Sequence, residues 1–210
     1  KKTPEKTENP ATGPLDRIHC DAVMIKHKTT GGSQGFSLIV DEFTKYIDVK
    51  LIKTKNETQE HIKEFILRMK ALGHQVKRLC TDLAAEFIQD INFKKWLIDH
   101  LVTQENSAPY AQYQNGVAER HIQTIEDRAS TILAASKLNK SMWGEAILCT
   151  VVNWNATTGT DKSPFELITR QEPDLNPLKP FRCQVFIHIP IKQQQHMGHQ
   201  AEAGIFIGYT

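Results

Sequence analysis

The sequence predicts a mixed α/β domain, in which a five-stranded sheet is flanked by helices and followed by a small C-terminal β-rich extension. Three observations predict this class. Strand-like alternation of apolar and polar residues dominates the first third of the chain, a helical apolar period follows it, and short strand-like and helix-like segments then alternate. The length of 210 residues and the 40% hydrophobic content are sufficient for a packed core.

The first three strands are expected at residues 17–25, 36–43 and 46–53, with the turn-rich sequence TTGGSQG between the first two. In the third strand, Ile47, Val49 and Leu51 alternate with Asp48 and Lys50. We expect one face of this strand to be buried and the other to contact water. Short connections between the strands predict an antiparallel meander.

A helix is expected to follow, because its apolar residues fall on one helical stripe. These residues are Ile62, Phe65, Ile66, Met69 and Leu72. Asn56 with Gln59 resembles a capping pair at the start of the helix, and Gly73 stands where a left-handed C-terminal cap belongs.

Two further strands and two long helices complete the predicted core. A buried strand at 76–82, a helix at 92–101 and a short strand at 101–104 predict a parallel extension of the sheet. Apolar spacing then predicts a long helix around 118–132 and another over 141–155, in which we expect Trp143 and Trp154 to pack in the core rather than in a subunit contact. We therefore divide the chain into an extended lead-in (1–15), a core (16–160) and a C-terminal extension (161–210), which we expect to be incomplete.

Composition excludes several classes of protein. The net charge of +2 excludes a polybasic arm or an acidic tail, and no apolar run reaches the length of a membrane span. The N-terminal sequence KKTPEKTENP lacks the apolar stretch of a secretory signal, so we expect a soluble intracellular protein without a membrane partner. The four cysteines form no CxxC pair and are expected to be reduced core residues.

Three carboxylates occupy positions that could be functional. Asp21 lies inside a predicted strand, Asp82 ends another, and Glu119 falls in the first turn of the long helix. Taken singly, an Asp at a strand end is usually a turn former and a Glu in a first helical turn usually complements the helix dipole. Three carboxylates that met at one sheet edge would instead provide oxygen ligands for Mg²⁺ and support displacement at phosphorus.

The surrounding motifs single out these three residues. The segments IHCDAV, RLCTDLAAEF and PYAQYQNGVAERHIQT resemble the catalytic core of copia-type (Ty1/copia) long-terminal-repeat retrotransposon integrases. The resemblance continues through KSPFELITRQEPDLNPLKPFRCQVFIHIP and AEAGIFIGY, so that it covers most of the chain. In that family, an Asp on the first strand, a second Asp and a Glu form the D,D-35-E set, which matches Asp21, Asp82 and Glu119.

The resemblance implies a ribonuclease H-like fold and a polynucleotidyl transferase that performs 3′-end processing and strand transfer. It implies two Mg²⁺ or Mn²⁺ ions per active site, held by Asp21, Asp82 and Glu119, while His19 is expected to be a strand neighbour and not a ligand. It also implies a mobile active-site loop at 108–116, action as a homo-multimer on element-end and target DNA, and residence in the nucleus after a cytoplasmic virus-like particle. The residues then expected to contact DNA are Gln112, Tyr113, Asn115, Arg120, Gln123, Lys94 and Lys95.

Two departures from the family pattern leave alternatives open. Leu83-Ala84-Ala85 replaces a typical Asn-Gly-Gly, and alanine restricts the close backbone approach that glycine permits. The first strand also continues as Ala-Val-Met-Ile where relatives have Gly-Pro. The alternatives are a catalytically impaired or domesticated integrase that serves as a DNA-binding or assembly module, and a nuclease on the same ribonuclease H-like fold.

Overall fold

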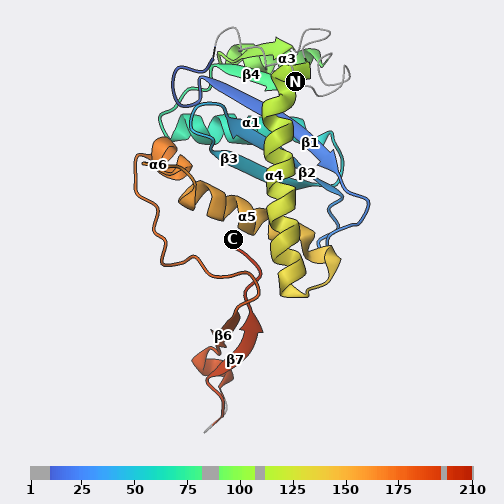
Figure 1. The fold of residues 1–210 in the computed structure, drawn as a ribbon, viewed down its shortest axis with the longest axis vertical. Helices are drawn as coiled ribbons and strands as arrows, with labels where there is room; N and C mark the ends of the chain where they lie inside the picture. The colour runs from blue at the N-terminus through green and yellow to red at the C-terminus, as the bar shows by residue number, and fades with distance from the viewer. Residues whose placement is uncertain (1–9, 82–89, 107–111, 195–197, 210) are drawn as a thin grey trace.

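A five-stranded mixed sheet forms the centre of the computed structural model, which describes residues 10–81, 90–106, 112–194 and 198–209 (Figure 1). The strands are arranged in the order β3-β2-β1-β4-β5. Their bounds are Arg17–Met24 (β1), Gly35–Asp41 (β2), Ile47–Ile52 (β3), Arg78–Thr81 (β4) and Thr103–Asn106 (β5). The predicted fold class is confirmed, since helices flank the sheet and a separate two-stranded sheet follows it.

The strand pairing confirms the predicted meander and its parallel extension. β1 pairs antiparallel with β2, and β2 pairs antiparallel with β3. β1 pairs in parallel with β4, which pairs in parallel with β5. Strand β1 therefore lies at the centre of the sheet, where its side chains are covered on both faces.

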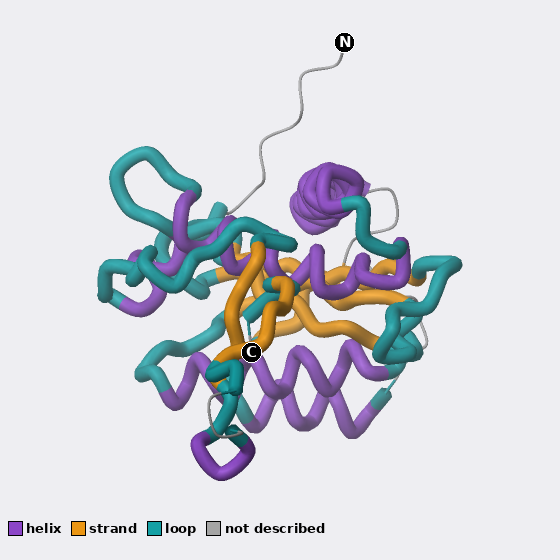
Figure 2. Tube along the Cα trace, turned by 90° about the horizontal axis from the view of Figure 1, so that it is seen from below, coloured by secondary structure: helices purple, strands orange, loops and turns teal. Residues whose placement is uncertain are grey.

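Helices cover both faces of the sheet, as Figure 2 shows. On one face, α1 (Glu57–Ala71) and α3 (Ile91–Asp99) contribute to a core that includes Ile18 and Leu79. On the other face, α4 (Gln112–Ser136) and α5 (Trp143–Thr157) enclose a core that includes Leu38 and Val40. Alternate residues of one strand therefore enter different cores, which explains why β2 is buried along its whole length.

Of the two caps predicted for α1, the C-terminal cap is confirmed and the N-terminal cap is not. Gly73 adopts the left-handed conformation (φ 81°), and the N–H of His74 donates to the carbonyl of Met69, as a glycine C-terminal cap requires. The predicted capping role of Asn56 is wrong, because its backbone is already helical and its side chain forms no capping hydrogen bond. The carboxylate of Glu57 instead accepts from the N–H groups of Lys53 and Thr54.

The expectation that one face of β3 contacts water is wrong at Asp48, whose side chain is 17% exposed, and holds in part at Lys50, whose side chain is 34% exposed. Helix α1 covers this face, and the carboxylate of Asp48 contacts His61 at 2.9 Å and Arg68 at 2.6 Å. Lys50 forms an ion pair with Glu64 of the same helix. Charged residues alternate along β3 because they bond to a covering helix, a pattern that sequence alone does not distinguish from exposure to solvent.

Core packing is confirmed for Trp143 of α5, whereas Trp154 is only partly buried at the edge of the same core. Trp143 is buried beside Phe36, and the indole N–H of Trp154 donates to the carbonyl of Lys45. A short 3₁₀ turn, η1 (Lys140–Met142), connects α4 to α5.

The C-terminal segment contains one helix that the periodicity did not predict. Helix α6 (Pro164–Thr169) is capped by Ser163 and buries Ile168 in the core. Strands β6 (Gln184–His188) and β7 (Ala201–Ile205), with the 3₁₀ turn η2 (Ile191–Gln193) between them, form an antiparallel hairpin that extends away from the core (Figure 1). The division at residue 160 stays a prediction.

All four cysteines are free, and Cys20, Cys80 and Cys149 are buried as expected. The expected core position is wrong for Cys183, which is only partly buried because it lies in the C-terminal segment outside the two cores. Burial raises the pKa of the Cys20 thiol to about 12, which makes this thiol unreactive at neutral pH. Within the described residues, no helix combines the length and apolar content needed to cross a bilayer.

Candidate active site

Asp21 lies on the central strand, on the face that carries α4. It pairs with Leu38 across β1 and β2, and directly paired residues project from the same face of a sheet. Leu38 belongs to the core that Ile122 and Ile125 of α4 complete. Asp21 is half-buried, and its Oδ1 accepts from the N–H of Ala22 at 2.7 Å. A carboxylate thus lies between a central strand and a long helix.

The strand that precedes Asp82 lies directly beside Asp21. Strand β4 ends at Thr81, and Thr81 pairs in parallel with Cys20, the residue before Asp21. Asp82 and the Leu83-Ala84-Ala85 segment lie outside the described residues.

Glu119 lies on α4, the helix that covers this face of the sheet. Its neighbour Ala118 is fully buried, and Ile122, one turn later, is 5% exposed, so the helix is held against the sheet on both sides of Glu119. Glu119 itself is exposed. Asp21 and Glu119 therefore belong to the same side of the sheet, one on the strand and the other on the covering helix.

A buried polar network occupies the same face of β1, next to Asp21. Imidazole Nε2 of His19 contacts Oε2 of Glu42 at 2.7 Å, and the guanidinium of Arg17 donates to the same carboxylate at 3.3 Å. Oε1 of Glu42 accepts from the N–H of Ala11. Although burial opposes its ionisation, the hydrogen bond from His19, the bond from Ala11 and the charge of Arg17 lower the pKa of Glu42 to about 2. Glu42 is therefore a permanent anion that anchors β1.

The network continues across β4 and β5. The guanidinium of Arg17 donates to Glu105 at 3.2 Å, and that of Arg78 donates to Glu105 at 3.3 Å and to Asp16 at 2.9 Å. The hydrogen bond that the Thr12 N–H donates to Asp16 lowers the pKa of this carboxyl, although burial opposes the shift. Hydrogen bonds from Lys77 and Arg78 lower the pKa further. Sequence reasoning missed these residues, because their partners come from distant segments. His19 is a strand neighbour of Asp21, as expected.

The residues expected to contact DNA lie in several places. Arg120 and Gln123 are exposed on α4, and Lys94 and Lys95 are exposed on α3. The side chains of Gln112, Tyr113 and Asn115 lie outside the described residues. The expected loop at 108–116 is wrong from Gln112 onward, because α4 begins at this residue. No proline follows Gln112 in this stretch to prevent the helix. Residues 107–111 lie outside the described residues.

His121 follows Glu119 by two residues and ties α4 to α5. Its ring stands edge-on to Trp154, with centroids 5.7 Å apart, and its Nδ1 contacts the carbonyl of Val117. Burial lowers the pKa of His121, and the positive charges of Lys45 and Arg120 lower it further. His121 is thus a neutral packing residue at neutral pH.

A second constellation could be mistaken for a hydrolase site. Nδ1 of His61 lies 2.9 Å from the Ser37 hydroxyl, and its Nε2 lies 2.9 Å from Asp48. This set resembles a Ser-His-Asp triad, but Ser37 is fully buried beneath α1. A substrate could not reach the hydroxyl, so the set serves to fasten α1 to the sheet.

No group of three or more metal-ligating side chains occurs within the described residues. The set of Asp21, Asp82 and Glu119 is only partly within them, so its convergence stays a prediction. Three carboxylates nevertheless form the donor set that hard divalent cations prefer.

Comparison of the sequence with known proteins finds relatives among transposons, whereas no family model matches. The chain is 29% identical over 200 residues to the retrovirus-related Pol polyprotein from transposon TNT 1-94 of Nicotiana tabacum, and this match covers 93% of the chain. It is 23% identical over 205 residues to the Pol polyprotein from transposon RE2 of Arabidopsis thaliana, covering 94% of the chain. The matches span only 15% and 14% of the lengths of these polyproteins.

Solved structures share the fold. The HTLV-2 integrase catalytic core domain in complex with magnesium matches with a TM-score of 0.54 at 17% identity, covering 75% of this chain and 99% of that domain. A protein of the simian T-cell lymphotropic virus intasome, solved with a PP2A regulatory subunit, matches with a TM-score of 0.63 at 16% identity, covering 97% of this chain and 72% of that one. The ribonuclease H-like fold of integrase catalytic cores is thereby confirmed.

The resemblance drawn from the sequence is confirmed as well. The homologues are Ty1/copia-type Pol polyproteins of plant transposons, and the structural neighbours are retroviral integrase catalytic cores.

Proposed function

We propose that the chain is the catalytic core of a retrotransposon integrase, a polynucleotidyl transferase that processes the 3′ ends of element DNA and joins them to target DNA. The observation that carries the proposal is the parallel pairing of β1 with β4 beneath α4. Cys20 of β1 pairs with Thr81 of β4. The proposed ligand Asp21 follows Cys20 in the sequence, and the proposed ligand Asp82 follows Thr81. Glu119 comes from the helix that covers the same face.

The three carboxylates suit two Mg²⁺ or Mn²⁺ ions, because these cations bind anionic oxygen ligands. Neutral or cationic side chains in place of Asp21, Asp82 and Glu119 could not hold them. Such ions would activate the attacking oxygen and stabilise the departing 3′-oxygen. The HTLV-2 cores of the same fold were solved in complex with magnesium, which supports this choice of cation.

The protein side chains position the acids and the substrate. The hydrogen bonds of His19 and Arg17 to Glu42 hold β1 in place two residues before Asp21. Arg120 is exposed beside Glu119, with its Nε bonded to the carbonyl of Gly116, and its remaining guanidinium N–H groups are suited to a DNA phosphate. Gln123 lies one turn farther along the exposed face of α4 and would contact the same strand. Gln112, Tyr113 and Asn115 are proposed contacts on sequence grounds.

We further propose that the protein works as a homo-multimer on element-end and target DNA in the nucleus, after a cytoplasmic virus-like particle stage. The HTLV-2 cores are described in dimeric and trimeric forms, and the simian virus neighbour is an intasome, which supports a multimer.

The test compares the parent with Asp82→Asn in a strand-transfer assay, using a longer protein that contains this chain, labelled element-end DNA and a plasmid target. We expect the substitution to abolish joined product in both Mg²⁺ and Mn²⁺, because it removes a ligand charge. Asp161→Asn, at an exposed acid beyond α5, is the matched control and should join DNA like the parent. Equal product from the parent and Asp82→Asn would remove Asp82 from the mechanism.

The sequence Leu83-Ala84-Ala85 favours a second candidate, an impaired integrase that acts as a DNA-binding or assembly module. Alanine limits the backbone conformations that glycine would allow next to Asp82. Replacing the three residues by Asn-Gly-Gly tests this candidate. Joined product that appears only after the replacement would support it, and product from the parent itself would exclude it.

A further inference from the structure

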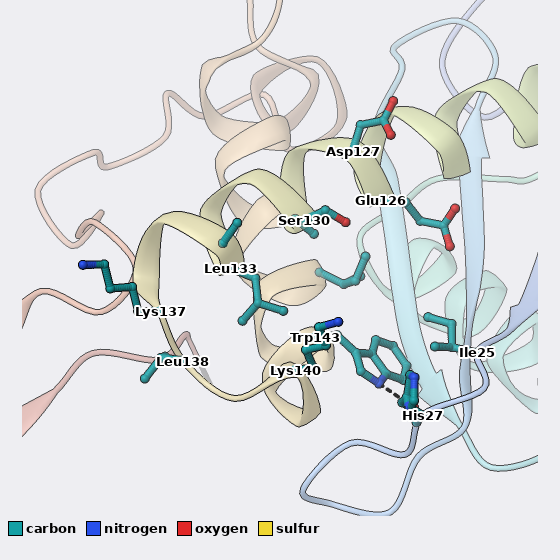
Figure 3. A pocket seen from close by; sticks show the side chains of 13 residues that line it. Ile25, His27, Glu126, Asp127, Ser130, Leu133, Lys137, Leu138, Lys140 and Trp143 are labelled. Atoms are coloured by element: carbon teal, nitrogen blue, oxygen red, sulfur yellow. Dashed lines mark hydrogen bonds between the residues drawn. The ribbon is translucent and has the colours of Figure 1, made fainter.

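A cavity of about 650 Å³ lies between α4 and α5, and neither Asp21 nor Glu119 lines it (Figure 3). Apolar side chains from α4, α5 and the loop after β1 line it, among them Ile25, Ala129, Leu133, Trp143 and Ile147. The indole N–H of Trp143 donates to the carbonyl of His27 at 2.8 Å, which fixes the ring in the wall of the cavity. The cavity has the volume and the apolar lining of a preformed binding site.

The two ends of the cavity carry opposite charges. Glu126 and Asp127 of α4 lie at one end, and Lys137 and Lys140 lie at the other (Figure 3). Burial raises the pKa of Glu126, and the charge of Asp127 raises it further. Within the described part of the chain, neither carboxylate forms an ion pair, so a cationic group brought to this end would be stabilised.

Helix α3 carries a surface with the matching chemistry. Ile91, Ile98 and Leu101 are 79%, 70% and 79% exposed, respectively. Lys94 and Lys95 lie between the two isoleucines on the same side of the helix, since steps of three and four residues share a face. Phe93 and Leu97 fill the opposite, buried face. The result is an apolar stripe that contains two lysines and that none of the described helices and strands covers.

The same chain cannot bring these two features together. Phe93 and Leu97 hold α3 in the core on one face of the sheet, whereas Leu133 and Trp143 belong to α4 and α5 on the other face. An α3 stripe that fills the cavity must therefore come from another molecule.

We propose that α3 of one copy of this chain docks into the α4–α5 cavity of a second copy. Ile91 and Ile98, about 10 Å apart along the helix at 1.5 Å per residue, would contact the apolar wall. Lys94 and Lys95 would face Glu126 and Asp127. Asp99, with the negative end of the α3 dipole, would face Lys137 and Lys140. This is recognition of a helix by a groove, and it makes a head-to-tail contact.

The proposal deepens the multimer proposed above by naming its surfaces. It rests on that part of the proposed function and does not involve Asp21, Asp82 or Glu119. Self-association is measured without DNA or metal and therefore tests the docking proposal alone. Strand transfer tests the catalytic proposal, so either proposal can fail while the other stands.

The first experiment measures self-association of the chain by sedimentation velocity over a range of concentrations. We expect the parent to associate, and Ile98→Glu to weaken association at least tenfold, because it places a charge in the apolar contact. Lys94→Glu/Lys95→Glu and Glu126→Lys/Asp127→Lys should each weaken it similarly through like-charge repulsion. Lys53→Glu/Lys55→Glu, which makes the same charge change at two exposed lysines elsewhere, should leave it unchanged.

The second experiment mixes the two charge-reversed proteins. Acidic α3 helices from one protein then meet basic cavities of the other, so the mixture should associate although neither protein does so alone. A mixture that remains monomeric would overturn the proposal, as would association of each variant at the parent's strength. Loss of binding to duplex DNA by Lys94→Glu/Lys95→Glu, with association unaltered, would assign the lysines to phosphate contacts and would also overturn it.

Discussion

Glu42 is the residue on which the polar network beside the candidate site depends. Its carboxylate accepts from the guanidinium of Arg17, from the N–H of Ala11 and from the imidazole of His19. Its side chain is only 13% exposed. A buried carboxylate with three partners stabilises the fold when it is ionised, and leaves its partners unsatisfied when it is protonated or replaced.

The first prediction concerns the pH dependence of this stabilisation. The pKa of Glu42 falls from 4.5 to about 2 on folding, so its contribution is complete above pH 4.5 and is lost as the pH falls toward 2. We expect Glu42→Gln to lower the free energy of unfolding at pH 7 by about 1–2 kcal/mol, after allowance for solvent screening. Urea unfolding at pH 7, 5 and 3 should show the difference between parent and variant shrinking as the pH falls.

The matched control for this prediction is Glu60→Gln, at an exposed carboxylate on the solvent side of α1. It should change stability by less than about 0.5 kcal/mol at every pH. If the difference in free energy of unfolding between the parent and Glu42→Gln stays constant from pH 7 to pH 3, the lowered pKa of Glu42 is not the source of the stabilisation.

Only some residues of the candidate site could be predicted from the sequence. Asp21 and Glu119 could be singled out because motifs surround them. Glu42, Glu105 and Arg17 could not, because their contacts join residues 23 to 88 positions apart in the chain. A motif identifies residues near each other in sequence, whereas this network is created by the pairing of β1 with β2 and β4.

Among the elements, α5 stabilises the edge of the sheet through a single side chain. Strand β3 is the edge strand, and its Ile47 has a neighbouring strand on only one side. The amide of Asn155 accepts from the N–H of Ile47 at 2.9 Å and donates to its carbonyl at 2.7 Å. The helix thus supplies both hydrogen bonds that a further strand would have made.

The next prediction follows from these two bonds. Asn155→Ala leaves a buried N–H and a buried carbonyl without partners, so we expect it to lower the free energy of unfolding by about 2–4 kcal/mol. Chemical denaturation with tryptophan fluorescence would measure this loss. Asn153→Ala, two residues away and half-buried, removes only a weak bond to the Cys149 sulfur and should cost less than about 1 kcal/mol. Similar losses from both variants would show that the edge bonds contribute little.

The elements differ in how far sequence predicts them. The strands of the meander and the helices α1, α4 and α5 were predicted because long periodic patterns determine them. Helix α6 has only six residues, too few for a period to show, and its start is determined by the cap at Ser163. The covering of β3 by α1 was missed because alternating charges look the same under a helix as in water.

On the scale of the whole molecule, the chain consists of a two-faced core and a projecting hairpin. The antiparallel meander and its parallel extension could be predicted from the order of elements along the chain, whereas the central place of β1 was found in the structure. The contribution of residues beyond 160 to the core could not, because the contact of α6 depends on where the chain returns to the sheet. Ile168 is 1% exposed there, and its carbonyl contacts Nε2 of His74 at 2.7 Å.

The last prediction separates the core from the hairpin by truncation. Within the described residues, β6 and β7 pair with each other and expose Phe186 and Ile187 to solvent, 71% and 60% respectively. Ending the chain after Arg182 should therefore change the free energy of core unfolding by less than about 1 kcal/mol, since little buried core surface is lost. Ending it after Ser163 removes Ile168, so we expect a loss of about 3 kcal/mol or more.

Because the shorter truncated chain also lacks Phe181, Ile168→Ala in the full chain provides the matched comparison. It removes only the apolar contact of α6 and should account for about 2–4 kcal/mol of the loss. Thermal and urea unfolding of the four proteins would decide the matter. If the chain ending at Ser163 is as stable as the parent, the core ends near residue 160, as the sequence predicts. If it is destabilised to the same extent as Ile168→Ala, the insertion of Ile168 into the core beneath α1 and α3 makes α6 part of the core that supports the candidate site.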